Sequence, residues 1–433
     1  MINLSEYMPG WLILSLLFVF GAFVGRYLNI CIRRFPEDDE LLEQLKLTLG
    51  RHPVCYRCNG AASLVHRLPI IGWLTQAGRC SRCNSRLTLE PLFVEVATAG
   101  LFALTYWLHI PMDADARLTS SGLHSVEGPV GPGVAGLWEP VVWLHARYAL
   151  HMFMICGLIA ATMIDLRLRI IPDGTTVPVC VAGILLSVIV GQVFVVPIWF
   201  QDASVVRTVQ PLMPELIQPL FVDWDVSDFI ARWPRVHGLL VSLVGAAAGA
   251  GAVWAVRVIG GYVLKQEAMG QGDVILMGMI GSVIGWQPVL AVFIFAPMLG
   301  VAFSIFNWLA RGDKQIAYGP FLSAATILLL LTWKMSWPFA KRFFDMGPLF
   351  IVMGLFMLVL LFASLQLVQI AKRLLGLDLY GLEEESDWPP ADQLMYLSQE
   401  VPDEQTGQWP VEQWSGVRAG QGLAREYNWR NDD

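Results

Sequence analysis

Long apolar runs separated by polar loops dominate the pattern of this chain. Runs such as Trp11–Phe23 and Leu349–Leu367 approach the roughly 20 residues that a helix needs to cross the hydrocarbon of a bilayer. The pattern predicts spans at about residues 9–30, 92–110, 148–164, 177–198, 239–259, 274–286, 289–308, 321–337 and 349–370. The predicted fold class is therefore all-α, a polytopic α-helical integral membrane protein with about 8–9 transmembrane helices.

The composition agrees with a membrane protein. Hydrophobic residues make up 55% of the chain and charged residues only 15%, where a soluble domain carries about a quarter charged residues. The charge is also uneven, because segment 377–433 holds 13 acidic and 3 basic residues. A lipid bilayer is thus the expected environment, and nucleic acid is not expected as a partner because this acidic segment repels phosphate.

Basic residues predict how the chain is oriented. The first apolar run follows a start without Lys or Arg, so it is predicted to be a retained span and not a cleaved signal peptide. Nine Lys and Arg residues between positions 33 and 86 predict a cytoplasmic loop by the positive-inside rule. The amino terminus and the loops near 111–146 and 199–236 are then external, and nine crossings return the tail to the cytoplasm. Lys341 and Arg342 are predicted to lie outside, against the rule, and an eight-span alternative would place the tail outside.

Four of the seven cysteines form two C-x-x-C pairs in this first loop. Cys55, Cys58, Cys80 and Cys83 are arranged with 21 residues between the pairs, which is close to a known zinc-site spacing. Four thiolates can hold Zn²⁺ tetrahedrally in a closed structural site. A disulfide or redox pair and incidental cysteines are the alternatives, and a reducing cytoplasm disfavours the disulfide.

Two aspartates lie where apolar runs meet the same polar side. Asp165 directly follows one run and Asp273 directly precedes another. Carboxyl groups at such a depth are functional candidates because their burial is costly. A pair brought together could share one proton and act as general acid and base on a peptide bond, as in an aspartyl protease. The alternative is that each caps a helix or pairs with Arg167, Arg169 or Lys265.

Six sequence blocks follow one another in the order and spacing of a known family. They are Gly21–Pro36, the two cysteine pairs, Glu90–Glu95, Ile164–Asp173, Met269–Asp273 and Tyr318–Phe321. The chain resembles the bacterial type IV prepilin peptidases, the leader peptidase/N-methyltransferases of the Gly-x-Gly-Asp aspartyl protease group. The resemblance implies that Asp165 and Asp273 are the catalytic pair, with Gly270 and Gly272 supporting the second aspartate.

The resemblance also implies a substrate, cofactors and a location. Family enzymes remove the leader peptides of prepilin and pseudopilin precursors at the cytoplasmic face of the bacterial inner membrane. Many then methylate the new amino terminus with S-adenosylmethionine, and their first cytoplasmic domain carries zinc. This implies a multi-pass inner-membrane enzyme of type IV pilus or type II secretion systems, with an active site facing the cytoplasm.

A second group of matched residues is expected to serve substrate binding or methyl transfer. They are Gly25, Asn29, Arg34 and Glu95. The Gly21–Gly25 spacing lies within an apolar helix and is expected to serve helix packing. Two positions depart from the family: Ile275 stands where a lysine is usual, removing a cation that could tune Asp273, and Arg26 replaces a small residue.

These inferences divide the chain into four parts. They are a first transmembrane helix (1–30), a cytoplasmic zinc-binding loop domain (31–90), a polytopic peptidase core (91–376) and an acidic, flexible tail (377–433). The tail could instead bind a partner through its four tryptophans. A zinc-stapled scaffold of a pilus or secretion assembly remains an alternative function. A proton-coupled transporter is a third, although it predicts inverted repeats and midplane aspartates, which the sequence does not contain.

Overall fold

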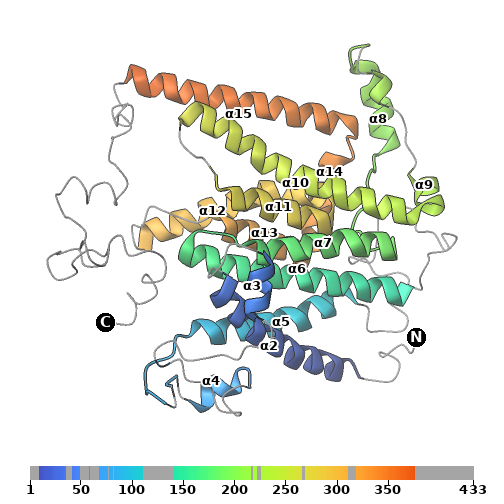
Figure 1. Cartoon of the computed structure of the whole chain (residues 1–433). Coiled ribbons are helices and arrows are strands. Elements are labelled where there is room, and N and C mark those ends of the chain that lie inside the picture. Colours follow the sequence, from blue (N-terminus) through green and yellow to red (C-terminus); the bar gives the residue numbers. More distant parts are fainter. Residues whose placement is uncertain are drawn as a thin grey trace, which may run out of the picture. The chain divides into compact units, whose positions relative to one another are not determined.

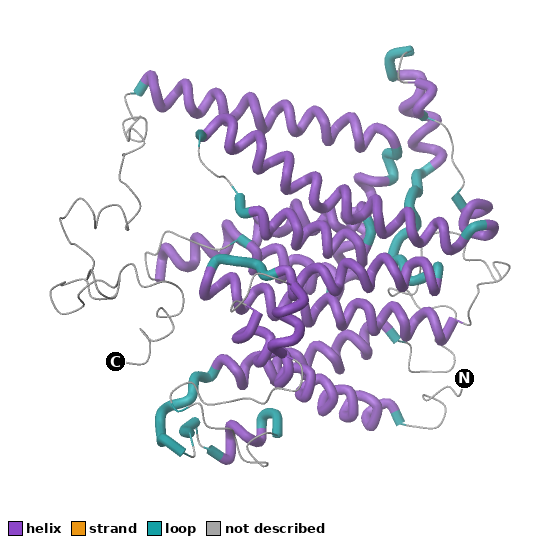
Figure 2. The backbone as a smooth tube through the Cα atoms, viewed as in Figure 1, coloured by secondary structure: helices purple, strands orange, loops and turns teal. Residues whose placement is uncertain are grey.

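The structure is a computed structural model that describes residues 9–35, 41–48, 58, 68–76, 78–80, 82–110, 140–215, 218–221, 226–265, 269–310 and 318–375. Regular structure in these residues is helical, apart from one antiparallel bridge between Arg79 and Arg86 (Figure 2). The chain divides into two units, residues 1–365 and 366–433. Only 366–375 of the second unit is described, so the tail prediction for 377–433 lies outside the described residues.

The helices follow the chain in the order shown in Figure 1. They are α2 (Gly10–Arg34), α3 (Leu41–Thr48), α4 (Ile71–Thr75), α5 (Glu90–His109), α6 (Pro140–Leu168), α7 (Asp173–Val190), α8 (Ala203–Val209), η4 (Gln210–Leu212), η5 (Gln218–Leu220), α9 (Ser227–Arg232), α10 (Pro234–Leu264), α11 (Gln271–Ile284), α12 (Trp286–Ala310), α13 (Gly319–Leu331), α14 (Trp333–Phe344) and α15 (Pro348–Leu374).

The prediction of a polytopic helical membrane protein is confirmed. In the described parts of the chain, 7 helices are long and apolar enough to cross a bilayer: α2, α5, α6, α7, α10, α12 and α15. The bent pair α13–α14 makes an eighth if it is counted as one span, and α11 is a shorter apolar helix. Large apolar side chains such as Trp11, Trp254 and Phe356 are exposed on the outside of these helices, as lipid-facing surfaces require.

Three predicted boundaries are wrong. Helix α6 begins at Pro140, so residues 140–146 are helical although the sequence pattern assigned them to an external loop. Helix α7 ends at Val190, where the prediction continued to 198. The predicted span 321–337 is two helices, α13 and α14, that meet at a 104° bend. Residues 199–236, predicted to be an external loop or short interfacial helices, contain the short helices α8, η4, η5 and α9.

Polar side chains explain why α7 stops early. Gly191 ends the helix with a φ of 77°, a conformation that glycine adopts without strain. The segment that follows is buried but not helical, and other side chains bind its carbonyls. The buried Arg147 donates from Nε to the carbonyl of Val193 at 3.1 Å, and Gln287 donates to that of Pro197 at 3.2 Å. These bonds satisfy backbone groups that a helix would otherwise pair internally.

Glycines bring pairs of helices into close contact. A Cβ atom on Gly25 of α2 would lie 2.8 Å from Cα of Glu95 in α5, and one on Gly21 would lie 2.9 Å from Cα of Ala99. The expected packing role of Gly21 and Gly25 is therefore confirmed. A Cβ on Gly249 of α10 would clash with the carbonyl oxygen of Met277 in α11, so α10 and α11 also pack backbone to backbone.

Helix α6 lies at the centre of the packing. It contacts α2, α5, α7, α11 and α13, and its residues Met154, Ile155 and Leu158 are fully buried. Because the last turn of α6 carries Asp165, this central position brings that carboxyl group among the ends of several other helices. The fold thereby prepares a site at one end of the bundle.

Candidate active site and metal centre

The carboxyl group of Asp165 is buried against the beginning of α13. Only 6% of Asp165 is exposed, and a Cβ atom on Gly319 would lie 2.6 Å from its Oδ2 atom. A side chain at position 319 would therefore displace this carboxyl group. Because Gly319 is the first residue of α13, the positive end of that helix dipole faces the carboxyl group, which favours a negative charge there.

Asp273 lies in the first turn of α11. It is 8% exposed, and Gly270 caps the helix with extended backbone. A Cβ atom on Gly272 would lie 3.0 Å from Cβ of Ile171, so Gly272 also lies in a close contact. The two predicted support glycines thus stand beside Asp273, where a larger residue at 272 would press on Ile171.

Ile171 and Tyr318 join the two carboxyl groups into one site. Cδ1 of Ile171 would lie 3.2 Å from a Cβ on Gly319, so this side chain lies near both Gly272, which precedes Asp273, and Gly319, which faces Asp165. Asp165 and Asp273 interact electrostatically. Burial and the charge of Asp273 raise the pKa of Tyr318 to about 12, so the phenol keeps its proton and can donate it to a hydrogen bond. The sequence blocks included Ile171 and Tyr318 without assigning a role to either.

Two buried carboxyl groups in one site have a definite chemical consequence. Like charges in a site of low polarity repel, so the pair retains one proton more readily than two isolated carboxyl groups would. Oδ2 of Asp165 has no hydrogen-bond partner among the described residues. Such an acceptor is suited to bind a polar group of a substrate or a water molecule.

Of the alternative partners of Asp165, Arg169 interacts with it electrostatically, whereas Arg167 is engaged elsewhere. Arg167 forms an ion pair with Glu90 at the start of α5.

Ile275 is 36% exposed and lies two residues beyond Asp273 in α11, and side chains at this spacing do not face each other on a helix. The predicted loss of a tuning cation is therefore a smaller change than the sequence indicated, because position 275 faces away from Asp273.

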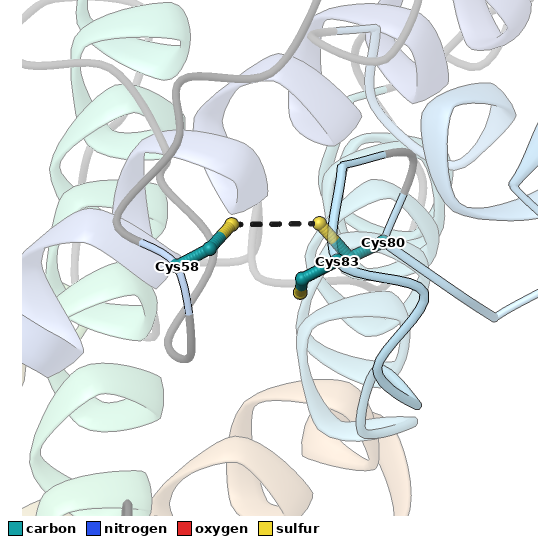
Figure 3. A group of neighbouring side chains, drawn as sticks. All are labelled: Cys58, Cys80 and Cys83. Carbon is teal, nitrogen blue, oxygen red and sulfur yellow. Dashed lines mark hydrogen bonds between the residues drawn. The ribbon is translucent and has the colours of Figure 1, made fainter.

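Three of the four predicted metal ligands converge. The Sγ atoms of Cys58, Cys80 and Cys83 all lie within 4.8 Å of one another, with Cys58 and Cys80 separated by 3.9 Å (Figure 3). Zinc–sulfur bonds of about 2.3 Å in a tetrahedron imply sulfur separations of about 3.8 Å. The three thiols could therefore hold a metal ion. Cys55, the fourth predicted ligand, lies outside the described residues.

A tight turn presents Cys80 and Cys83 together. The amide of Cys80 donates to the carbonyl of Ser85 and the amide of Asn84 donates to that of Cys80, both at 2.9 Å. Asn84 has a φ of 57°, which asparagine tolerates better than most residues. The amide of Arg82 also points at Sγ of Cys80. We call residues 78–87 the cysteine knuckle.

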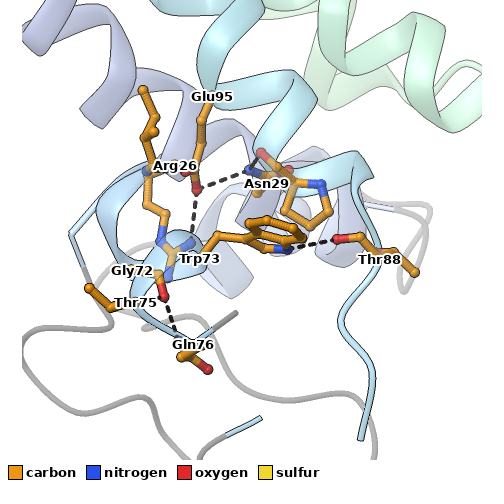
Figure 4. Close-up of polar contacts among 10 residues, drawn as sticks. Arg26, Asn29, Gly72, Trp73, Thr75, Gln76, Thr88 and Glu95 are labelled. Atoms are coloured by element: carbon orange, nitrogen blue, oxygen red, sulfur yellow. Dashed lines mark hydrogen bonds and ion pairs between the residues drawn. The ribbon is translucent and has the colours of Figure 1, made fainter. Parts of the chain in front are cut away.

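Glu95 connects the first loop to the membrane helices. It is fully buried in α5, where its Oε1 atom accepts from Arg26 at 2.8 Å (Figure 4). Its Oε2 atom accepts from the amide of Ile70 at 2.6 Å. Asn29 lies beside it and donates to the carbonyl of Pro91 at 3.0 Å. Glu95 therefore has a structural role, and Arg26 is the partner that balances its charge.

The cysteine loop and the aspartates share one end of the bundle. Gln44 of α3 accepts a hydrogen bond from the amide of Gly174 at the start of α7, at 2.7 Å. The ion pair between Glu90 and Arg167 links the start of α5 to the end of α6. Asn29 and Arg34 belong to the last turns of α2, so the structure brings them to this end as well. It does not place Asn29 or Glu95 against the aspartates.

Comparison with known proteins agrees with this arrangement. The bacterial peptidase A24 N-terminal domain model matches residues 19–109, and the type IV leader peptidase family model matches residues 229–305. The chain is therefore similar to the type IV leader peptidase family. The first match contains the cysteine loop and Glu95, and the second contains Asp273; Asp165 lies between the two matches.

Curated relatives align with most of the chain. A prepilin leader peptidase/N-methyltransferase of Aeromonas salmonicida is 24% identical over 356 residues, covering 76% of this chain and 94% of that protein. A protein of the same description from Myxococcus xanthus is 25% identical, covering 70% of this chain and 67% of its own length. One from Pseudomonas putida is 23% identical, covering 73% and 90%. No solved structure gives a significant match.

Proposed function

We propose that this chain is a membrane aspartyl endopeptidase that removes the leader peptide of type IV prepilin-like precursors at the cytoplasmic membrane face. The observation that carries the proposal is the meeting of two buried carboxyl groups, from α6 and α11, at the start of α13. The names of the curated relatives support the same substrate class.

In this proposal the aspartates exchange acid and base roles. One carboxylate takes a proton from a water molecule as the water oxygen attacks the peptide carbonyl, while the protonated partner donates to the carbonyl oxygen. The carbon–nitrogen bond then breaks as the amine leaves with a proton. Tyr318 stays protonated beside Asp273 and is placed to orient a carbonyl or a water molecule.

The cytoplasmic placement rests on charge. The end that carries the aspartates also carries Arg33 and Arg34 at the end of α2, and Arg167, Arg169, Arg257 and Lys265, a distribution typical of a cytoplasmic face. We further propose that Zn²⁺ is the metal of the cysteine site, because a donor set of converging thiols suits this ion. Bound zinc would fix the loop structurally, and no step of peptide cleavage passes through it.

Methyl transfer from S-adenosylmethionine is proposed as a second activity, supported by the names of the relatives. Gly25, Asn29, Arg34 and Glu95 remain candidates for that region, although Gly25 and Glu95 serve helix packing and ion pairing in the structure. The zinc-stapled scaffold is less well supported, because Ile275 does not face Asp273 and so does not weaken the carboxyl pair.

The test is cleavage of a model prepilin by the purified protein in detergent. Wild type is compared with Asp165→Asn and Asp273→Asn, and mass spectrometry separates leader loss from a methyl increment. Leader loss by wild type alone supports the peptidase, and a methyl increment supports the second activity. An uncut precursor with wild type, under conditions where an authentic family enzyme cuts it, would favour the scaffold.

A further inference from the structure

Helix α14 runs across the membrane spans instead of along them. It follows α13 after a 104° bend. The 13 residues of α13 rise about 20 Å, which is less than the hydrocarbon thickness of about 30 Å. Because α13 starts beside Asp165, α14 lies toward the opposite membrane face, at the depth where interfacial helices insert into the boundary between headgroups and acyl chains.

One face of α14 is fixed on the protein. Trp333, Trp337 and Phe344 are buried on this face. The ring of Trp337 lies 6.1 Å from that of Phe200, and the ring of Phe344 lies 5.6 Å from that of Trp286 in α12. These contacts hold the helix in one rotation about its axis, so the residues on its other faces have defined surroundings.

A second apolar stripe of α14 is uncovered. Met335, Phe339 and Phe343 recur every fourth residue and are 82%, 59% and 43% exposed. Exposed aromatic and methionine side chains in such a row are unfavourable in water and favourable in an acyl environment. An amphipathic helix with bulky apolar residues on one side and bases on another is typical of attachment to a lipid surface.

The charges of α14 select the kind of lipid. The helix contains Lys334, Lys341 and Arg342 and no acidic residue. Lys341 lies over the ring of Phe200 at 5.8 Å and near Asp202, so it is engaged within the protein. Lys334 and Arg342 are exposed beside the apolar stripe, where they can reach the phosphate layer.

We propose that α14 is an interfacial anchor: Met335, Phe339 and Phe343 lie among acyl chains, and Lys334 and Arg342 bind the headgroups of anionic phospholipids. This inference is independent of the peptidase proposal. The anchor also explains why basic residues lie on the membrane face opposite the aspartates, where the positive-inside rule does not predict them. Anionic headgroups in that layer attract these residues.

Photo-crosslinking of the full chain in nanodiscs tests the proposal. Benzoylphenylalanine replaces Phe339, and the discs contain equal amounts of phosphatidylcholine and phosphatidylglycerol. Phe356 of α15, 61% exposed, is the lipid-facing control position, and Leu212, 74% exposed in η4, is the control outside the predicted spans. Mass spectrometry then identifies the adducts at each position.

Phospholipid adducts are expected at 339 and 356 and not at 212, with phosphatidylglycerol enriched roughly fivefold or more at 339. The double variant Lys334→Gln, Arg342→Gln should melt like wild type and lose this enrichment. Absence of lipid adducts at 339, when 356 gives them, would overturn the insertion, and crosslinks to protein would assign the stripe to a protein interface. Equal adducts of the two lipids in wild type would overturn the role of the bases.

Discussion

The aspartate pair and the cysteine knuckle are held in place by different means. Asp165 and Asp273 come from two helices, and their positions depend on contacts of Gly319, Gly272 and Ile171 within the bundle. The knuckle is a short turn with few buried apolar residues, and its thiols, Cys80 and Cys83, lie within 4.8 Å of each other and of the Cys58 thiol. The comparison indicates that helix packing determines the geometry of the active site, whereas a bound metal would determine that of the loop.

The largest effect is expected from adding one methyl group next to Asp165. Gly319→Ala would place a Cβ 2.6 Å from Oδ2 of Asp165, and displacement of a reacting group by about 1 Å costs about 100-fold in rate. Steady-state cleavage of a model prepilin measures this loss. Gly251→Ala is the matched control, since nothing lies within 4 Å of its Cβ position. Equal rates for the two variants would show that packing at Gly319 does not control the site.

Metal removal is expected to act mainly on the loop. Cys80→Ser should abolish stoichiometric zinc and raise hydrogen exchange in residues 68–89, because metal binding and local folding are coupled. The cleavage rate should stay within about tenfold of wild type, since the bundle packing is unchanged. Cys180→Ser, a thiol outside the cluster, should retain the metal. Complete loss of cleavage in Cys80→Ser would contradict the separation of the two centres.

A smaller effect is expected at the link between the two regions. Glu95→Gln removes the charge that balances Arg26. Breaking a buried ion pair costs several kcal/mol, but Arg26 is partly exposed, so we expect the protein to lose about 2 kcal/mol of stability. Thermal unfolding in detergent measures it. Glu43→Gln breaks an exposed pair with Lys46 and should change stability by less than about 1 kcal/mol. Similar losses of stability in both variants would contradict the structural role of the Glu95–Arg26 pair.

The smallest effect is expected at position 275, where the chain departs from the family motif that it resembles. Ile275→Lys should leave the cleavage rate within about twofold of wild type, because residues two apart on a helix do not face each other. The pH dependence of kcat/KM is the accompanying measurement. A displaced pH profile with a tenfold change in rate would show that a cation at 275 reaches Asp273.

Apolar periodicity predicted most of the fold, because each membrane helix must satisfy its own backbone. The prediction failed where side chains, and not helical hydrogen bonds, satisfy the backbone. Arg147 and Gln287 bind the backbone carbonyls after Gly191. No local sequence pattern predicts these partners, because they are distant along the chain. The bend between α13 and α14 was also missed, since Thr332 and Trp333 continue an apolar run whose hydropathy does not reveal direction.

The sequence predicted which residues form the candidate site but not how they are arranged in space. Local motifs identified Asp165, Asp273 and the cysteines, because the chemistry requires those residues. The contacts of Ile171 and Gly319 depend on how α6, α11 and α13 meet, and this lies beyond any single segment. The Arg26–Glu95 pair could have been found from the charge that Glu95 carries within an apolar run, which requires a buried partner.

A double-mutant cycle on the carboxyl pair tests the central claim most directly. Single-turnover cleavage rates are measured for wild type, Asp165→Asn, Asp273→Asn and the double variant in detergent, with thermal unfolding as the control for folding. If both carboxyl groups form one catalytic unit, each single variant loses about 10²–10⁴-fold and the double variant loses no more than the worse single one. Losses that multiply, or a single variant that keeps the wild-type rate, would contradict the claim.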